Sequence, residues 1–433
     1  MLSPLDLSLV NGPIPIAATV AAAVALTYLA IRKTRTWWTR VLPIVVLACA
    51  VVAFGLSFVV DHVWKPWPEP LPVILTVWVG AVLTALALAA VRLRSGRWYG
   101  RVFGVLLALG VATSAMVATN AHFGQYPNMR AVLDVFRNDR VELNEAAPPP
   151  SGVLEVPAGK KLADVWKRPA ELPDKGTVSE ATIPGTFAAR PAWIYLPPAY
   201  ATTPRPKLPV IVLMAGQPGS PRDWFDGGRI VDNMDAFARE HDGLAPIIVV
   251  VDQLGSTTAN PLCLDSALGK SETYLAHDVP AWIKQRLTVD ERREAWTVAG
   301  FSHGGTCSVQ LAVRAPDVYG NFIALAPQHE PTLGSRQETV RAAFGGDEAA
   351  FVRVNPMDII ARQRFQQTSG VVVASRYDGL YRDAGANLFE ACRKAGMDVL
   401  WKELPYNHDW NLAREGFYGS LPWLLAGRTG LLR

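Results

Sequence analysis

Residues 295–307 read AWTVAGFSHGGTC, and this stretch decides the fold of the C-terminal part of the chain. Ala295–Ala299 is an apolar run typical of a buried strand, and the residues from Gly304 onward are typical of a helix. Between them, residues 300–304 match G-x-S-x-G, a pattern whose weight comes from its strand–turn–helix context. The glycines allow a tight turn that exposes the Ser302 hydroxyl at the end of the strand. A serine that only caps the helix is the structural alternative.

Short apolar runs alternate with longer amphipathic stretches from about residue 176 onward. This alternation predicts an α/β domain with a mostly parallel sheet covered by helices on both faces. The first two runs are close in sequence and predict an antiparallel hairpin at one edge. The expected strands are Thr177–Ile183, Ala192–Leu196, Val210–Met214, Ile247–Val251, Ala295–Ala299, Phe322–Leu325, Val371–Ala374 and Val399–Leu404. The expected helices are Asp226–Glu240, Ser271–Leu287, Gly304–Ala315, Ala384–Ala395 and one near Gly416–Leu425.

Two polar side chains follow later strands and complete a candidate catalytic set with Ser302. Asp378 follows the seventh expected strand and His408 follows the eighth. Active sites of open α/β sheets collect at the carboxyl ends of such strands. The order Ser302, Asp378, His408 is that of the α/β-hydrolases, in which the His is the base and the acid orients it. Asp383 is the main alternative acid, and Asp409 is a weaker one.

The loop after the third expected strand is a candidate donor to an oxyanion. Residues 215–220 read AGQPGS, and the backbone N–H of Gln217 is the natural donor because Pro218 has none. The second donor is expected to be the N–H of His303, directly after the serine. An ordinary Gly/Pro turn is the alternative for this loop.

The four cysteines suggest at most one disulfide. Cys49 lies in an apolar stretch and Cys392 in an expected helix, whereas Cys263 and Cys307 flank the candidate site. We expect a disulfide between these two, with a pair of unpaired buried thiols as the alternative. No spacing suggests zinc, and no GxGxxG or Walker pattern is present, so no metal or cofactor is expected.

The N-terminal third is predicted to be a four-helix transmembrane domain. Each apolar stretch has about 20 residues and no charge, which is enough to cross a hydrocarbon core. No Asp, Glu, Lys, Arg or His lies inside a stretch, which favours anchoring over transport. The four stretches are Ile14–Ile31, Val41–Val60, Leu71–Val91 and Val102–Thr119.

Charge predicts the orientation of these spans in the plasma membrane. Residues 1–119 carry nine Lys and Arg against three Asp and Glu. Most of the basic residues lie in two loops, which are therefore expected to be cytoplasmic, with both termini and the catalytic domain outside. The basic loop residues are Arg32, Lys33, Arg35, Arg40, Arg92, Arg94, Arg97 and Arg101. The remaining 314 residues carry 33 Lys and Arg and 35 Asp and Glu, which argues against nucleic-acid binding.

These observations divide the chain into three parts. Residues 1–119 form the transmembrane domain, residues 120–175 a linker that contains three consecutive prolines, and residues 176–433 the α/β domain. Nothing in the sequence indicates the oligomeric state.

Residues 177–410 resemble the bacterial putative-esterase family of α/β-hydrolases, which includes esterase D-type enzymes and the antigen 85 mycolyltransferases. The matching pieces are ARPAWIYLPPAY at 189–200, the AGQPGS loop, Trp224, Asp252, GFSHGGTC at 300–307, YDG at 377–379 and NHDW at 407–410. With four preceding spans, the chain resembles membrane-anchored esterases of actinobacteria. The resemblance implies a nucleophile at Ser302, a base at His408 and an acid at Asp378. His303 departs from the family, because many relatives carry Met after the nucleophile.

The sequence therefore predicts an extracytoplasmic serine esterase anchored in the membrane. Its expected substrates are esters of membrane lipids or of envelope glycolipids, because tethering concentrates substrates near the membrane. An acyltransferase of the mycolyltransferase kind is the first alternative, because water and an alcohol use the same machinery. An inactive receptor or scaffold with a hydrolase fold and a lipid transporter are the others.

Overall fold

The computed structural model describes residues 3–67, 69–94, 98–136 and 140–432. The chain forms two compact units, Met1–Arg137 and Asn138–Arg433, so the boundary falls within the expected linker. Arg97, one of the expected basic loop residues, lies outside the described residues.

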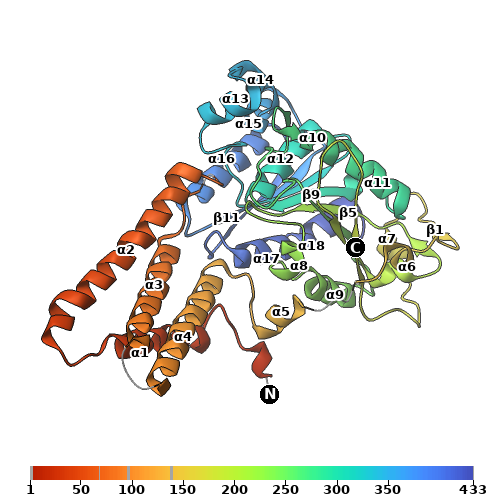
Figure 1. Ribbon diagram of the computed structural model, residues 1–433. Helices are drawn as coiled ribbons and strands as arrows, with labels where there is room; N and C mark the ends of the chain where they lie inside the picture. Colours follow the sequence, from red (N-terminus) through yellow and green to blue (C-terminus); the bar gives the residue numbers. More distant parts are fainter. Residues whose placement is uncertain (1–2, 68, 95–97, 137–139, 433) are drawn as a thin grey trace. The chain divides into compact units, whose positions relative to one another are not determined.

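Four long apolar helices make up most of the first unit (Figure 1). Each overlaps one predicted apolar stretch and is long and apolar enough to cross a membrane. The second is continuous over Trp37–Trp64, with a π-helical turn at each end. The elements are η1 (Pro4–Asp6), α1 (Pro13–Ala30), η2 (Trp37–Val41), α2 (Leu42–Phe58), η3 (Val59–Trp64), α3 (Val73–Leu93), α4 (Trp98–Phe123) and α5 (Met129–Asp134).

Small side chains form the packing surfaces between these helices. Helix α4 packs against α1 and α3, and α3 also packs against α2. Ala25, Ala85 and Ala108 are buried together with Leu29 at these contacts, which lets the backbones approach closely. Large apolar side chains such as Leu47 and Leu106 are exposed on the outer faces, as expected of helices that face lipid.

The segment before α1 pairs with the segment after α4. Asp6 forms an ion pair with Arg130 at 2.7 Å, and Ser8 and Asn128 form an antiparallel bridge. The side chain of Asn120 also donates to the Tyr126 carbonyl oxygen at 2.8 Å. The chain therefore enters and leaves the four-helix unit at the same end.

An eight-stranded sheet is the centre of the second unit. Its order is β12-β11-β10-β9-β5-β6-β3-β2, and every pair is parallel except β2/β3 and β3/β6. The predicted antiparallel edge hairpin is thus confirmed. The sheet strands are β2 (Thr177–Ala181), β3 (Ala192–Leu196), β5 (Val210–Met214), β6 (Ile247–Val251), β9 (Trp296–Phe301), β10 (Asn321–Leu325), β11 (Ser369–Ser375) and β12 (Asp398–Leu404). Short strands β1 (Val153–Leu154), β4 (Arg205–Pro206), β7 (Asp265–Ser266) and β8 (Gly269–Lys270) form two small pairs outside it.

Helices cover both faces of this sheet (Figure 1). Helices α12 and α16 lie on one side, and α8, α9 and α17 lie on the other. Most residues on the central strands are apolar and buried, as expected of a sheet covered on both faces. The principal helices are α8 (Asp223–Asp226), α9 (Ile230–Glu240), α11 (Val279–Arg286), α12 (His303–Arg314), α13 (Arg336–Phe344), α14 (Glu348–Val354), α15 (Pro356–Arg362), α16 (Gly379–Lys394), α17 (Trp410–Tyr418) and α18 (Leu421–Leu424). The remaining short helical turns are α6 (Leu143–Ala146), α7 (Leu162–Val165), η4 (Pro198–Ala201), α10 (Ser271–Thr273), η5 (Tyr274–Asp278), η6 (Arg293–Ala295) and η7 (Leu425–Thr429).

All eight expected strands are present, but three expected helices are wrong in extent. Helix α16 begins at Gly379, five residues before the helix predicted over Ala384–Ala395. The helix predicted over 226–240 begins only at Ile230, because Arg229 has a φ of 53° and the chain turns there after the short helix α8. The last helix is divided into α17 and α18, with Gly419 and Ser420 between them. Gly227–Gly228 and Gly419–Ser420 lie at these two breaks, and glycine-containing pairs of this kind are sequence signals for the end of a helix.

Strand register brings the carboxyl ends of the central strands to one level. Met214 of β5 is opposite Gly300 of β9, and Phe301 is opposite Leu325 of β10. Leu325 is in turn opposite Val373 of β11. The loops that follow these strands therefore meet at one edge of the sheet.

Candidate active site

Ser302 occupies a strained turn between β9 and α12. Its φ of 57° and ψ of −117° are unusual for a residue other than glycine. Its amide donates to the Leu325 carbonyl at 2.8 Å, which holds the turn on the neighbouring strand. A Cβ on Gly304 would lie 2.5 Å from the Met214 carbonyl oxygen, and a Cβ on Gly300 would collide with Gly304. At both glycines of the pattern, neighbouring backbone atoms lie too close for a side chain to fit.

His408 lies between two aromatic rings just beyond β12. Its ring stacks on Tyr381 with centroids 3.8 Å apart and on Phe301 with centroids 4.7 Å apart. Burial lowers the pKa of His408 to about 3, because the charged imidazolium would lose its hydration. The imidazole is therefore neutral at neutral pH, which is the form a general base needs.

None of the three candidate acids accepts a hydrogen bond from His408 in this conformation. Within the part of the chain that the structure describes, His408 Nδ1 is buried and has no hydrogen-bond partner. Asp378 instead caps α16, its Oδ1 accepting from the Leu380 amide at 3.2 Å. Asp383 is exposed and pairs with its neighbour Arg382, whereas Asp409 caps α17.

Ser375 nevertheless ties the acid loop to the histidine loop. Its hydroxyl donates to the Tyr406 carbonyl oxygen at 2.7 Å and accepts from the Asp378 amide at 2.9 Å. Asp378 and His408 therefore follow adjacent parallel strands whose loops are linked by one buried side chain.

Two backbone amides near Ser302 are free to bind an oxyanion. Among the described hydrogen bonds, neither the Gln217 amide nor the His303 amide donates to another group of the chain. The loop after β5 is close to the nucleophile, because a Cβ on Gly216 would lie 3.4 Å from Ser302 Cβ. The His303 amide is at the N-terminus of α12, where the helix dipole favours negative charge.

The loop after β5 is held from several sides. Gln253 donates to the Ala215 carbonyl oxygen at 2.6 Å, and Arg190 donates to the Gly219 carbonyl oxygen at 2.9 Å. Arg190 also forms an ion pair at 2.8 Å with Asp252, whose side chain is 1% exposed. These contacts fix the backbone that carries the Gln217 amide.

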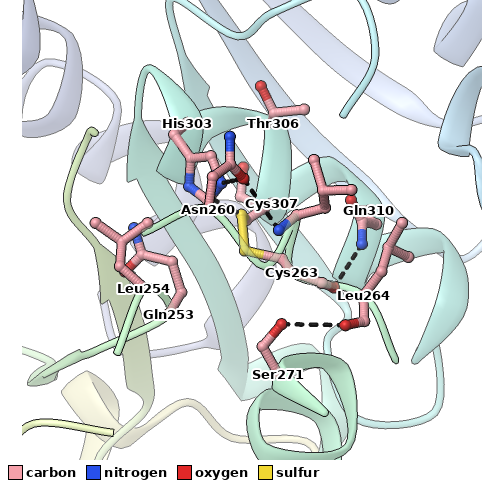
Figure 2. Close-up of a disulfide and its surroundings, with 12 residues drawn as sticks. Gln253, Leu254, Asn260, Cys263, Leu264, Ser271, His303, Thr306, Cys307 and Gln310 are labelled. Atoms are coloured by element: carbon pink, nitrogen blue, oxygen red, sulfur yellow. Dashed lines mark hydrogen bonds between the residues drawn. A yellow bond between two sulfur atoms is a disulfide. The ribbon is translucent and has the colours of Figure 1, made fainter. Parts of the chain in front are cut away.

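The expected disulfide is present next to the nucleophile. Figure 2 shows Cys263, from the loop after β6, joined to Cys307 of α12 beside the His303 ring. The unpaired-thiol alternative is therefore wrong for these two residues, whereas Cys49 and Cys392 are free. Cys263, Cys307 and His303 lie close enough to share a metal ion, but the disulfide removes both thiolates as ligands.

Comparison with known proteins assigns the family. The family model described as "Putative esterase" matches residues 188–415, which include Ser302, Asp378 and His408. The chain belongs to this esterase family. Its members are hydrolases of the α/β-hydrolase fold, and the mostly parallel sheet of the second unit agrees with that fold.

One relative of this esterase matches both units. It is an "Uncharacterized protein" from Corynebacterium glutamicum, 34% identical over 420 residues, which are 96% of this chain and 95% of the relative. The esterase is also similar to an S-formylglutathione hydrolase from Agrobacterium tumefaciens (18% identity, TM-score 0.49, 59% of this chain and 96% of that one). A CE1 ferulic acid esterase from Anaeromyces mucronatus is similar as well (16% identity, TM-score 0.46, 64% of this chain and all of that one).

Sequence reasoning missed several polar residues of the esterase site. Asn260 bonds to both residues proposed as oxyanion donors, Ser375 links the loops after β11 and β12, and Gln253 holds the loop after β5. Each belongs to a loop or strand end without regular spacing to the serine. Only their positions in three dimensions reveal them.

Proposed function

We propose that the protein is a membrane-anchored, extracytoplasmic serine esterase that uses Ser302, His408 and Asp378. The observation that carries this proposal is the Ser302 turn, which combines a strained backbone with two uncommitted amides at the end of β9. Membership in the esterase family supports the reaction class. The neutral, partly buried His408 supplies the group that can take the serine proton.

The first half-reaction forms an acyl-enzyme. Ser302 Oγ attacks the carbonyl carbon of the ester while His408 takes the hydroxyl proton. The carbonyl oxygen becomes an oxyanion, which accepts from the amides of Gln217 and His303. Collapse of this intermediate breaks the bond to the alcohol oxygen, and His408 returns the proton to that leaving group.

The second half-reaction releases the acid. His408 takes a proton from water, the hydroxide adds to the acyl carbon, and the Ser302 oxygen leaves with the proton that His408 returns. An acceptor alcohol that replaces water gives an ester instead of an acid. The two reactions are therefore distinguished by their products and not by the machinery.

Asp378 is the proposed acid although it caps α16 in this conformation. The cap uses Oδ1, and the link through Ser375 supports a position close to the His408 loop. The carboxylate would accept from His408 Nδ1, which stabilises the imidazolium formed during attack. Such a contact also raises the pKa of His408, because a nearby negative charge favours the protonated ring.

Four observations support the membrane location and the lipid or envelope esters proposed as substrates. The four helices are long and apolar enough to cross a membrane, and the basic loops favour a cytoplasmic position for the loops after α1 and α3. The segments before α1 and after α4 lie at one end of the unit. The disulfide suits an oxidising compartment.

Covalent labelling of the full-length protein in detergent by a fluorophosphonate probe tests this function. We expect labelling of the wild type, none of Ser302→Ala, and a loss of at least about 10²-fold in rate for His408→Gln. Ser256→Ala is the matched control, because Ser256 is exposed and belongs to the loop after β6. Labelling of Ser302→Ala equal to wild type would refute the assignment. Assays with glycolipid esters, with and without acceptor alcohols, then separate hydrolysis from transfer.

A further inference from the structure

The side chain of Asn260 contacts both residues whose backbone amides are proposed to bind the oxyanion, Gln217 and His303. Asn260 Nδ2 donates to Gln217 Oε1 at 3.0 Å, and Asn260 Oδ1 lies 2.9 Å from His303 Nε2. Asn260 Nδ2 also donates to the Thr332 carbonyl oxygen at 3.1 Å, and Oδ1 accepts from the Leu262 amide at 3.0 Å. Both N–H groups and both lone pairs of the Asn260 amide are thus used.

The other hydrogen bonds of Gln217 determine which atoms of Asn260 and His303 donate. Gln217 Nε2 donates to the Thr258 and Ala259 carbonyl oxygens at 2.8 and 3.1 Å, so its Oε1 is the atom that faces Asn260. Asn260 must therefore present its nitrogen to Gln217 and its oxygen to His303. It follows that His303 carries its proton on Nε2 and donates it to Asn260.

The opposite ring nitrogen of His303 faces the disulfide. Nδ1 lies 3.6 Å from Cys307 Sγ, and Figure 2 shows the ring and Asn260 together on this side of the sulfur pair. Cys307 is bonded to Cys263, three residues after Asn260. The loop that carries Asn260 is thus attached to α12 by a covalent bond and by the His303 hydrogen bond.

We propose that Asn260 is a positioning residue that sets the spacing of the oxyanion hole, by holding the side chains of Gln217 and His303 at once. This inference rests on the proposed function, because those two residues supply the donor amides. Asn260 does not touch the reacting atoms. It acts by fixing two backbones that belong to different elements, the loop after β5 and the start of α12.

The test compares Asn260→Asp and Asn260→Ala with wild type in the full-length protein. Asp keeps the oxygen that accepts from His303 and Leu262 but loses both donors, whereas Ala loses all four bonds. We expect kcat for a short p-nitrophenyl ester to fall about 10-fold for Asp and about 100-fold for Ala, with KM changed less than threefold. Asn233→Ala, which removes the bonds from α9 to the Arg229 carbonyl oxygen and to the Tyr418 side chain, is the matched control.

Affinity for a trifluoromethyl ketone distinguishes positioning from a general structural effect. This inhibitor forms a tetrahedral oxyanion on the serine, so its Ki should rise in proportion to the loss of kcat/KM. Each rate is divided by the concentration of active Ser302, which is measured by burst titration. Unchanged kcat per active site, or a Ki that does not follow kcat/KM, would overturn the proposal. Where Asn260→Ala does not fold, Asn260→Asp alone decides.

Failure of the proposed function gives a different result. If Ser302→Ala retained full ester hydrolysis, the serine assignment would fall whatever the Asn260 variants do. If Ser302→Ala is inactive and both Asn260 variants are as active as wild type, only the positioning role falls.

Discussion

At the scale of single residues, Asp378 is both the proposed catalytic acid and the N-cap of α16, and two substitutions separate these roles. Asn keeps a side-chain oxygen for the α16 cap but removes the charge, whereas Ala removes both. We expect Asp378→Asn to lower kcat about 10²- to 10⁴-fold with little change in stability. Asp378→Ala should lose activity and also about 1 kcal/mol of unfolding free energy. Kinetics and thermal unfolding check this, with Asp383→Asn as the control, and activity lost in Asp383→Asn instead would move the acid to that position.

Two histidines removed from solvent, His303 fully and His408 in part, predict how stability depends on pH. Burial lowers the pKa of His303 to about 4 and that of His408 to about 3, below the unfolded value of about 6.5. At pH values between the folded and unfolded pKa, the unfolded chain binds more protons than the folded chain. The free energy of unfolding therefore has its full value above about pH 6.5 and falls as the pH decreases toward 3. Each histidine contributes a slope of at most about 1.4 kcal/mol per pH unit. Chemical unfolding between pH 4 and 7 should show a smaller slope for His303→Gln, and an unchanged slope would contradict the prediction.

At the scale of elements, the turn into α12 has no room for a side chain. A Cβ on Gly304 would lie 2.5 Å from the Met214 carbonyl oxygen of β5. Gly304→Ala should therefore displace α12 from the sheet, lower the unfolding free energy by about 1–3 kcal/mol and abolish probe labelling. Gly379→Ala at the start of α16 is the control, because nothing lies within 4 Å of its added Cβ. Equal labelling of both variants would show that the close approach is not needed.

The disulfide joins the Asn260 loop to the same helix. It closes a separation of 44 residues, for which the chain-entropy model gives a stabilisation of about 4 kcal/mol. The double variant Cys263→Ala/Cys307→Ala should lose about 2–5 kcal/mol of unfolding free energy and be labelled more slowly. Cys392→Ala controls for cysteine removal elsewhere. A double variant as stable as wild type would exclude this role.

At the scale of the whole molecule, the predicted topology is open to chemical labelling. Two variants are made in a Cys49→Ala background: Thr34→Cys, in the loop after α1, and Ala158→Cys, in the second unit. Both positions are exposed. On intact bacterial cells, a membrane-impermeant maleimide should modify Ala158→Cys at once and Thr34→Cys only after permeabilisation. The reverse pattern would place the catalytic unit in the cytoplasm.

The sequence predicts the architecture better than the contacts within the site. Apolar runs locate the four long helices and all eight sheet strands, because burial requires apolar residues at regular positions. The serine turn is predicted because its glycines are required sterically, so the short G-x-S-x-G pattern marks its position. Asn260 could not be predicted, since its partners Gln217 and His303 are about 40 residues away along the chain. The cap on α16 was likewise hidden, because Asp378 fits both an acid and a helix cap.

The bonding of Asn260 has a consequence for the chemical lifetime of the enzyme. Spontaneous deamidation starts when the following backbone nitrogen attacks the side-chain amide to give a cyclic imide. Here the next residue is Pro261, whose nitrogen carries no hydrogen and cannot form that ring. Deamidation would produce aspartate at position 260, the substitution expected to slow catalysis. The Asn–Pro sequence therefore protects this contact from chemical ageing.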